Sequence, residues 1–469
     1  MTQISIISGI YTDETSDWRG FMPVNKEPIM GDNGVSKGYL GQVHGATAQA
    51  SGYGRSRGGI ERNGACYRVM GSRLLGVSET GAVTDYGDVG DDGKPVSMDY
   101  SFDRVAIASA GGLWYLIDGA SSVVQVTDED LGAANDVLFI DGRFMTTDGD
   151  YLVITDLTDP MAVDPLKYGS AETDPDPIYA LCKIRGEVYA MGRFTIQNFR
   201  DVGGTGFPFT NNAAGFIPRG IAGPKTWSYF LESFAFLGCA RRERPSVYVA
   251  DSGSTRSIST QEVDKLLAAL TADELAAIEM EQRNDQNEQR LFMHLPDRTL
   301  CYMTQASAAV GQPVWITLRN GVEMDGAYPV RHLVPCFGKW LCASPDGQIG
   351  YVDEASTKFW GVDQGWEFRT NYLYNASKGA IIHRLELVGL PGRVAFGDEA
   401  HIFMSTSIDG ETFGREFSIS AGKFGQRAKR LVWWLNRRFA NSLVLRFRGV
   451  GNAHISFTRL EAEVEALAA

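Results

Sequence analysis

Short apolar runs separated by tight polar turns recur through the middle of the chain. Val105-Ala-Ile-Ala, for example, is followed by Ala110-Gly-Gly and then by the apolar run Leu113-Trp-Tyr-Leu-Ile. Because Gly and Asp adopt the backbone conformations that tight hairpins need, each such unit predicts two antiparallel strands. The predicted hairpins begin at Cys66, Val105, Val137, Tyr179, Phe234, Leu291 and Leu333.

The spacing of these hairpins predicts a repeating β architecture. Their starts lie 39, 32, 42, 55, 57 and 42 residues apart, and one propeller blade of four antiparallel strands takes ~40–50 residues. The 53 glycines and the 11% aromatic content agree with many short strands. We therefore predict a mainly β fold with an irregular six- or seven-bladed β-propeller over residues 61–365. An unrelated series of hairpins packed as a sandwich is the alternative.

One helical hairpin is predicted to interrupt the series, over residues 260–282. Val263, Leu266, Leu267 and Leu270 share one face of a first helix. The segment Thr271-Ala-Asp-Glu then matches a capping box and predicts a second helix that runs to about residue 282. We interpret the insertion as a packing element or a subunit contact.

The two flanks of the repeat region have different textures. Residues 1–60 are rich in Gly, Ser and Asn and predict an N-terminal arm with loops, apart from a strand at Ile4–Tyr11. Residues 366–469 predict a separate C-terminal antiparallel β-sandwich. Its predicted strands are Trp366–Tyr374, Ile381–Val388, His401–Ser407, Glu416–Ser420, Leu443–Phe447 and His454–Leu460.

Composition narrows the function. The net charge of −13 disfavours general binding to nucleic-acid phosphates. The N-terminus lacks the basic region of a signal peptide, and no run approaches the ~20 apolar residues that span a bilayer, so we expect no membrane contact. The six cysteines form no C-x-x-C pair and the histidines are scattered, which predicts reduced, mostly buried thiols in a protein made in the cytoplasm.

Three motifs resemble chemical sites, and we assign none of them. Ser56 lies in a G-x-S-x-G match, but the strand and the helix that make a nucleophile elbow are missing around it. The segment Ser407–Phe413 resembles the aspartate turn of sialidase propellers and is interpreted as a hairpin cap. The acidic runs at 85–92 and 172–176 lack calcium-loop spacing. We therefore predict no enzyme activity and no catalytic residue, metal ligand or cofactor.

Many weak similarities in the same chain order identify a family. Together they resemble the packaged-DNA stabilisation protein of Salmonella-type short-tailed phages, also called the tail hub or nozzle, over nearly the whole chain. The segments that carry the resemblance are Met22–Asn25, Gly38–Leu40, Ser56–Gly58, Tyr67–Leu74, Val153–Asp159, Tyr168, Phe234–Leu237, Pro245–Val249, Ser252–Ser254, Thr271–Leu275, Leu295-Pro and Ser407–Glu416.

The resemblance implies a structural role in the virion tail without catalytic residues. Six copies would form a ring beneath the portal and its adaptor, receive the tail needle or plug, retain packaged DNA and form the conduit for its ejection. Assembly would take place in the host cytoplasm, and tailspikes or fibres are further possible partners. Six copies at −13 each would carry −78, so an acidic channel would let duplex DNA pass without specific binding.

Two other functions remain open from the sequence. A propeller glycosidase would place two close carboxylates and an arginine cluster in one pocket at the propeller axis. A receptor-binding tail protein would be expected to trimerise with the help of a coiled-coil or collagen-like stalk, and the sequence has no such segment.

The charge is least even between Ala421 and Leu460. This segment holds nine Lys and Arg and no Asp or Glu, which leaves −22 for the other 429 residues. A solvated basic face, contact with the genome and a protein contact are the three interpretations. For a subunit or adaptor contact, we expect Arg430, Trp433, Arg437 and Arg438 to be buried or partly buried at the boundary. The candidate contact residues are Lys423, Arg427, Lys429, Arg430, Trp433, Trp434, Arg437 and Arg438.

Overall fold

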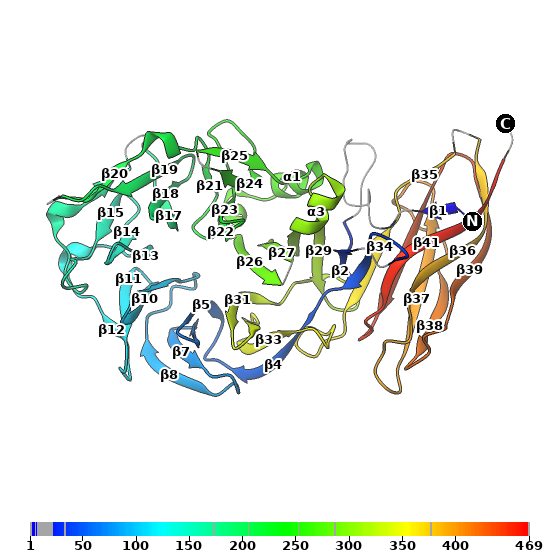
Figure 1. Cartoon of the computed structure of the whole chain (residues 1–469), viewed down its shortest axis with the longest axis horizontal. Helices are drawn as coiled ribbons and strands as arrows, with labels where there is room; N and C mark the ends of the chain where they lie inside the picture. The colour runs from blue at the N-terminus through cyan, green and yellow to red at the C-terminus, as the bar shows by residue number, and fades with distance from the viewer. Residues whose placement is uncertain are drawn as a thin grey trace.

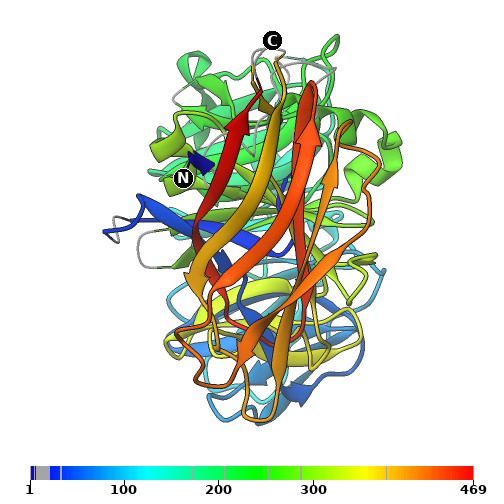
Figure 2. The same cartoon turned by 90° about the vertical axis from the view of Figure 1, so that its right-hand side faces the viewer.

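The protein consists of a β-propeller and a β-sandwich that lie side by side along the long axis of the molecule (Figure 1). A computed structural model describes residues 2–4, 6, 22–31, 34–171, 174–204, 206–251, 253–285, 288–375 and 378–467. Figure 1 looks into the ring of blades, and Figure 2 faces the sandwich end. The predicted propeller and C-terminal sandwich are both confirmed.

Seven antiparallel sheets of four or five strands surround the propeller axis (Figure 1), so the count resolves to the upper of the two values predicted. Blades one to three are β5 (Ser56–Arg62), β6 (Ala65–Met70), β7 (Arg73–Val77) and β8 (Val83–Asp88); β9 (Ser97–Tyr100), β10 (Arg104–Ser109), β11 (Gly112–Ile117) and β12 (Val124–Gln125); and β13 (Asp136–Ile140), β14 (Arg143–Thr147), β15 (Tyr151–Ile154) and β16 (Gly169–Ser170).

The remaining blades follow in chain order. They are β17 (Ile178–Ile184), β18 (Glu187–Gly192), β19 (Ile196–Asp201) and β20 (Phe209–Asn211); β21 (Gly220–Ile221), β22 (Trp227–Phe230), β23 (Ser233–Cys239), β24 (Ser246–Asp251) and β25 (Ser254–Ser257); β26 (Glu279–Asp285), β27 (Glu288–His294), β28 (Thr299–Met303), β29 (Trp315–Asn320) and β30 (Gly326–Ala327); and β31 (Arg331–Cys336), β32 (Lys339–Ala343) and β33 (Gln348–Asp353) with β4 (Gly45–Ser51).

Each blade contains one of the predicted hairpins. In blade three, Ile140 pairs with Arg143 across a two-residue turn. Asp141 and Gly142 have φ angles of 47° and 81°, the left-handed pair that a type I′ hairpin turn requires. The pairing of Phe234–Leu237 with Val247–Ala250 is also present, as β23 with β24. Local turn chemistry therefore explains why the repeat was visible in the sequence.

Where the structure describes it, the N-terminal segment forms strands at positions that were predicted to be loops. Strand β4 adds to β33 and completes blade seven, so the two ends of the propeller sequence share one sheet. Gly350 makes this pairing possible, because a Cβ there would lie 2.0 Å from the carbonyl oxygen of Thr47. Of the predicted strand Ile4–Tyr11, Ile4 is the last residue of β1 (Thr2–Ile4), Ile6 is buried, and the others lie outside the described residues.

The sandwich has two antiparallel sheets, seen from outside in Figure 2. Their inner faces share a core that includes Trp366, Phe447 and Phe457. One sheet is β2 (Lys26–Met30), β3 (Gly38–Gln42), β41 (Ser456–Ala466), β36 (Ala380–Leu390) and β39 (Leu431–Phe439), with β1 (Thr2–Ile4) beside β41. The other is β34 (Gly365–Arg369), β40 (Ser442–Val450), β37 (Glu399–Ser407) and β38 (Phe417–Lys423), with β35 (Leu373–Tyr374) beside β40.

The helical insertion is shorter than predicted. Helices α1 (Gln261–Ala268) and α2 (Ala272–Ala276) form, and Thr271 and Glu274 make the predicted capping box. The second helix does not reach residue 282, because residues 279–285 pair with β27 and form the first strand of blade six. Strand pairing thus overrides local helix preference there. Helix α3 (Thr304–Val310) and the 3-10 turns η1 (Glu129–Leu131), η2 (Pro165–Lys167) and η3 (Ala213–Gly215) were not predicted.

Candidate functional site

A chain of hydrogen bonds at the propeller axis joins blades one, six and seven. The Nδ1 of His332 on β31 lies 2.9 Å from the Oγ of Ser56 on β5. The Nε2 of the same ring lies 2.9 Å from the Oε2 of Glu279 on β26. His332 has a φ of 53°, a strained conformation for this residue type, which the surrounding bonds hold in place. These bonds tie the first blade to the last two.

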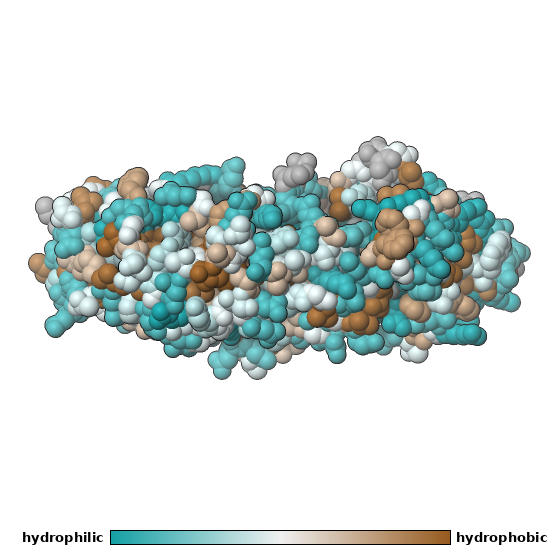
Figure 3. All heavy atoms as spheres, turned by 90° about the horizontal axis from the view of Figure 1, so that it is seen from below, coloured by the Kyte–Doolittle hydropathy of each residue, from teal (hydrophilic) through white to brown (hydrophobic). Residues whose placement is uncertain are grey.

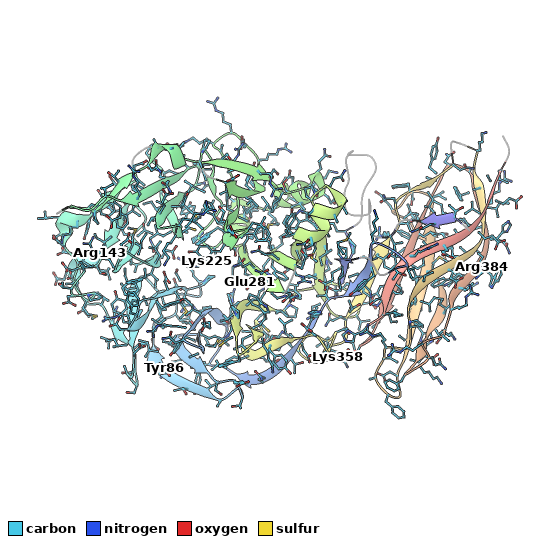
Figure 4. All side chains as sticks on the ribbon, viewed as in Figure 1. Tyr86, Arg143, Lys225, Glu281, Lys358 and Arg384 are labelled. Atoms are coloured by element: carbon cyan, nitrogen blue, oxygen red, sulfur yellow. The ribbon has the colours of Figure 1, made fainter. Side chains whose placement is uncertain are left out.

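A second cluster lies two residues along β26, at Glu281, which Figure 4 labels near the propeller centre. Its Oε1 accepts from the Nε2 of His294 at 2.6 Å, and its Oε2 accepts from the backbone N–H of Leu333 at 2.6 Å. The Nδ1 of His294 then accepts from the hydroxyl of Thr299 at 2.8 Å. Burial lowers the pKa of His294 to about 4, so the ring is neutral at pH 7.

The axial carboxylates do not suit glycoside hydrolysis. Burial raises the pKa of Glu279, but the hydrogen bond from His332, together with the electrostatic effects of His332, His294 and Arg331, lowers it to about 2. The pKa of Glu281 is also lowered, because hydrogen bonds outweigh its burial. A glycosidase needs one carboxyl with a raised pKa as general acid. A 410 Å³ cavity is lined by Arg55, Arg331, Glu274 and Glu279. Glu279 is hydrogen-bonded to His332, and Glu274 completes the capping box of α2.

Sequence reasoning discounted Ser56 as a nucleophile, and its setting agrees. Ser56 begins a strand rather than a turn before a helix, and it is 3% exposed. The hydrogen bonds nevertheless run from hydroxyl to imidazole to carboxylate, through Ser56, His332 and Glu279, as in a hydrolase triad. Neither His332 nor Glu279 could be linked to Ser56 from the sequence, since they lie 276 and 223 positions away.

The other predicted motifs are structural. The Asp409 carboxylate accepts from the Ser407 hydroxyl at 2.6 Å and from the backbone N–H groups of Glu411 and Thr412. These bonds lower the pKa of Asp409, and they form the predicted turn cap. In the acidic runs, Asp85 pairs with Arg73, while residues 172 and 173 lie outside the described residues.

The thiols and the helices add no further site. All six cysteines are free, and five of them are buried. Within the described part of the chain, no group of three or more His, Cys, Asp or Glu is placed to hold a metal ion. None of the helices in that part is both long enough and apolar enough to pass through a bilayer.

The basic segment lies partly at one edge of the sandwich; its Arg446, Arg448 and Arg459 are on β40 and β41, which have a strand on either side. It contains β39, which was not predicted as a strand and which pairs with β36 alone among its sheet neighbours. Strand β39 lies at the end of the molecule away from the propeller (Figures 1 and 2). The exposed candidates, named the basic edge below, are Lys423, Arg427, Lys429, Arg430, Trp434, Arg437 and Arg438.

Trp433 is a correction to the candidate set. Its indole is 3% exposed within the single chain, packs against Phe447 and donates from Nε1 to the carbonyl of Phe417 at 3.0 Å. It therefore belongs to the sandwich core. Side chains alternate along a strand, so the neighbouring Trp434 points outward and is 71% exposed, with the guanidinium of Arg384 5.5 Å from its ring centroid.

Partners outside the segment neutralise part of its charge. Arg430 makes a two-pronged pair with Glu386, and Glu416 accepts from both Arg446 and Arg448. Arg437 and Arg438 have exposed side chains and form no ion pair with any described residue. With Trp434, they give the edge an aromatic and two free guanidinium groups, the residue types that most often anchor protein interfaces.

The chain is similar to known phage proteins along nearly its whole length. A family model described as Bacteriophage P22 Gp10, beta-propeller, matches residues 2–357, and one described as Bacteriophage P22 Gp10, beta-sandwich, matches residues 365–465. The tail hub protein gp10 of Salmonella phage P22 is 28% identical, with 99% of each chain covered.

Solved structures give weaker likenesses. PorZ, a surface component of the type-IX secretion system of Porphyromonas gingivalis, matches 81% of this chain at 14% identity and a TM-score of 0.40, and this chain spans 46% of PorZ. The N-terminal domain of Nup159 matches 71% of this chain and 98% of its own, at 10% identity and a TM-score of 0.40. Because the two family models follow the propeller and the sandwich in order, the chain belongs to the bacteriophage P22 Gp10 family.

Proposed function

We propose that this protein is the tail hub of a short-tailed bacteriophage and a structural component of the virion tail. The observation that carries the proposal is the match over both domains, since the phage P22 tail hub protein aligns along 99% of each chain. The seven-bladed propeller with its appended sandwich is the architecture that those two family models describe.

In the finer part of the proposal, six copies form a ring beneath the portal adaptor, receive the needle or plug and retain the packaged DNA. The net charge of −13 supports a channel that repels phosphates and lets DNA slide. Six free thiols are consistent with assembly in the reducing host cytoplasm. Ring formation would depend on the adaptor, because copies with the same net charge repel one another at low salt.

The basic edge would contribute a subunit or adaptor contact. Trp434, Arg437 and Arg438 are exposed, and neither arginine forms an ion pair with a described residue. A solvated face or contact with the genome would leave assembly unchanged when Arg437 and Arg438 are reversed. We expect R437E/R438E to weaken ring assembly on the adaptor while the monomer keeps its fold.

A phage with a conditional null allele tests the hub role. Heads made without the protein should package DNA and then release it, so the nuclease-protected genome per particle should fall at least tenfold. Wild-type protein added to freshly filled heads should restore protection. Stable, filled particles without the protein would contradict the proposed function.

We propose that the hub is not an enzyme. The triad-like arrangement of Ser56, His332 and Glu279 at the propeller axis allows the most direct test of this part of the proposal. Capsular, lipopolysaccharide and sialylated substrates should release no sugar, and chromogenic esters should hydrolyse no faster than in buffer. Turnover that is lost in S56A or E279Q, while thermal unfolding stays unchanged, would overturn this part of the proposal.

A further inference from the structure

The two domains carry opposite net charges. Residues 366–469 contain 14 Lys and Arg and 10 Asp and Glu, a net charge of +4, so residues 1–365 carry −17. The domains follow one another along the long axis (Figure 1). The molecule is therefore a charge dipole with its positive end at the sandwich.

The negative charge is concentrated on blades two and three. Residues 118–170 contain 11 Asp and Glu against Arg143 and Lys167, and Lys167 pairs with Asp156 and Asp164. Blade three lies at the end of Figure 1 opposite to β39. The carboxylates of Asp128, Asp130 and Asp148 lie close enough to Tyr168 that, after burial, they raise the pKa of its phenol. We name these residues the acidic edge: Asp128, Glu129, Asp130, Asp148, Asp150, Asp156, Asp159 and Asp164.

Apolar side chains are exposed beside both edges. Leu166 is 87% exposed, and Leu157 and Tyr151 are also exposed next to the acidic edge. On the face seen in Figure 3, apolar patches are small and interrupted by hydrophilic atoms. A contact there would combine complementary charge with a few apolar anchors, as interfaces steered by charge do.

We propose that the basic edge of one copy docks on the acidic edge of a second copy. The inference rests on the proposed hub function and names the neighbour's surface. Two different patches of one chain meet in such a contact, which is the heterologous type that closes into rings. Copies that repel through their net charge of −13 attract through these two edges, because the edges face each other at short range and the remaining charge is screened by salt.

Charge reversal on each edge tests the contact in the purified full chain. At an ionic strength of about 0.15 M, where repulsion between copies is screened beyond about 8 Å, a carbodiimide should join Lys423 or Lys429 of one copy to carboxylates of the acidic edge of another. R437E/R438E and E129K/D130K should each reduce these cross-links at least fivefold, because both edges then carry the same sign. Mixing the two variants should restore cross-linked dimers, because each reversed edge then meets a complementary one.

Matched controls reverse charge elsewhere by the same amount. R242E/R244E on the loop of blade five and D346K/E354K on blade seven should keep wild-type cross-linking, since all four side chains are exposed away from both edges. Failure of the mixture to restore dimers, with each variant unfolding like wild type, would overturn the proposal.

Other placements of the two edges give different results. If R437E/R438E loses binding to the adaptor ring but keeps the cross-links, the basic edge contacts the adaptor instead. If E129K/D130K slows DNA ejection with cross-links unchanged, the acidic edge lines the channel. Either result overturns the proposed contact but leaves the hub function intact. Absence of the protein from virion tails would instead overturn the hub function, with the cross-links retained.

Discussion

The propeller and the sandwich bury charge in different ways. At the propeller axis, the carboxylates of Glu279 and Glu281 each accept a hydrogen bond from a histidine. In the sandwich, Lys26 is 0% exposed and donates from Nζ to the carbonyl of Ile455 at 2.7 Å. Its ammonium group lies over two aromatic rings, 4.6 Å from the ring centroid of Trp366 and 4.8 Å from that of Phe457.

This difference shows which domain is stabilised by its buried polar groups. Paired axial groups fix three blades to one another, and removal of one partner would leave a buried charge uncompensated. No carboxylate among the described residues pairs with Lys26, and burial lowers its pKa to about 7. Substitution of an axial polar group is therefore expected to destabilise the protein, whereas substitution of Lys26 in the sandwich is expected to stabilise it.

The largest effect is expected where the propeller closes. In G350V, the new side chain would meet the Thr47 carbonyl and the Trp360 ring, so β4 cannot stay paired with β33. We expect a loss of more than about 4 kcal/mol, at the upper end for a single substitution. Hydrogen exchange should show blades one and seven losing protection before the sandwich.

The matched control is G206A, because nothing lies within 4 Å of a Cβ at that position. It should unfold within about 0.5 kcal/mol of wild type. If G350V unfolded like G206A, strand β4 would not be what closes the ring.

The second prediction has the opposite sign. K26M should stabilise the protein by about 3 kcal/mol at pH 7, because the unfolded chain binds this proton up to its ordinary pKa of 10.5 and the folded chain only up to about 7. Wild-type stability should therefore rise as the pH increases from 7 to 10.5, and the advantage of K26M should disappear over that window. Urea unfolding at several pH values measures both.

The expected gain of about 3 kcal/mol for K26M already allows for the loss of the hydrogen bond to Ile455, which costs about 1 kcal/mol. K378M is the control, since Lys378 is exposed. Equal stability of K26M and wild type at pH 7 would mean that Lys26 is solvated.

Acid should weaken the axis rather than the sandwich. The folded pKa of His294 is about 4 against 6.5 when unfolded, so the unfolded state binds more protons between these values and stability falls as the pH falls. We expect a loss of about 2 kcal/mol between pH 7 and pH 5. H294Q should start less stable and lack this part of the pH dependence. A parallel pH profile for both proteins would assign the acid sensitivity elsewhere.

The sequence predicted the parts of the fold that depend on local chemistry. Hairpins such as the one at Asp141-Gly142 are set by adjacent turn residues, so all seven were placed correctly. Strand β4 was missed because its partner β33 lies about 300 positions away and its own Gly-Ala-Thr-Ala composition is not strand-like. Residues 279–282 were assigned to a helix because the capping box signals where a helix begins but not where it ends.

The residues of the candidate site were likewise predicted where local sequence identifies them and missed where distant segments must come together. Charge counting located the segment that contains the basic edge, because residues 421–460 hold nine Lys and Arg and no Asp or Glu. It could not separate Trp433 from Trp434, since only the alternation of β39 decides which indole is buried. The axial cluster was missed altogether, because Ser56, Glu279 and His332 are neighbours only after the ring closes.

The smallest predicted effect concerns the joint between the two domains. Asn25 is fully buried, and its side-chain amide donates to the carbonyls of Arg319 in blade six and Gly365 in the sandwich, at 2.9 Å and 2.8 Å. Its Oδ1 accepts from the backbone N–H of Arg319 at 3.0 Å. These three bonds connect the regions compared above.

N25G removes these bonds without backbone strain, because Asn25 has a φ of 53°, where glycine is at ease. We expect a loss of about 1.5 kcal/mol, since the carbonyls left behind are buried. N63G is the matched control: Asn63 has a φ of 52° but lies exposed in a hairpin turn, so its loss should stay below about 0.5 kcal/mol. Calorimetry of N25G should also separate the unfolding of propeller and sandwich, because the joint that couples them is weakened. Equal losses in N25G and N63G would mean that the domains are held together by other contacts.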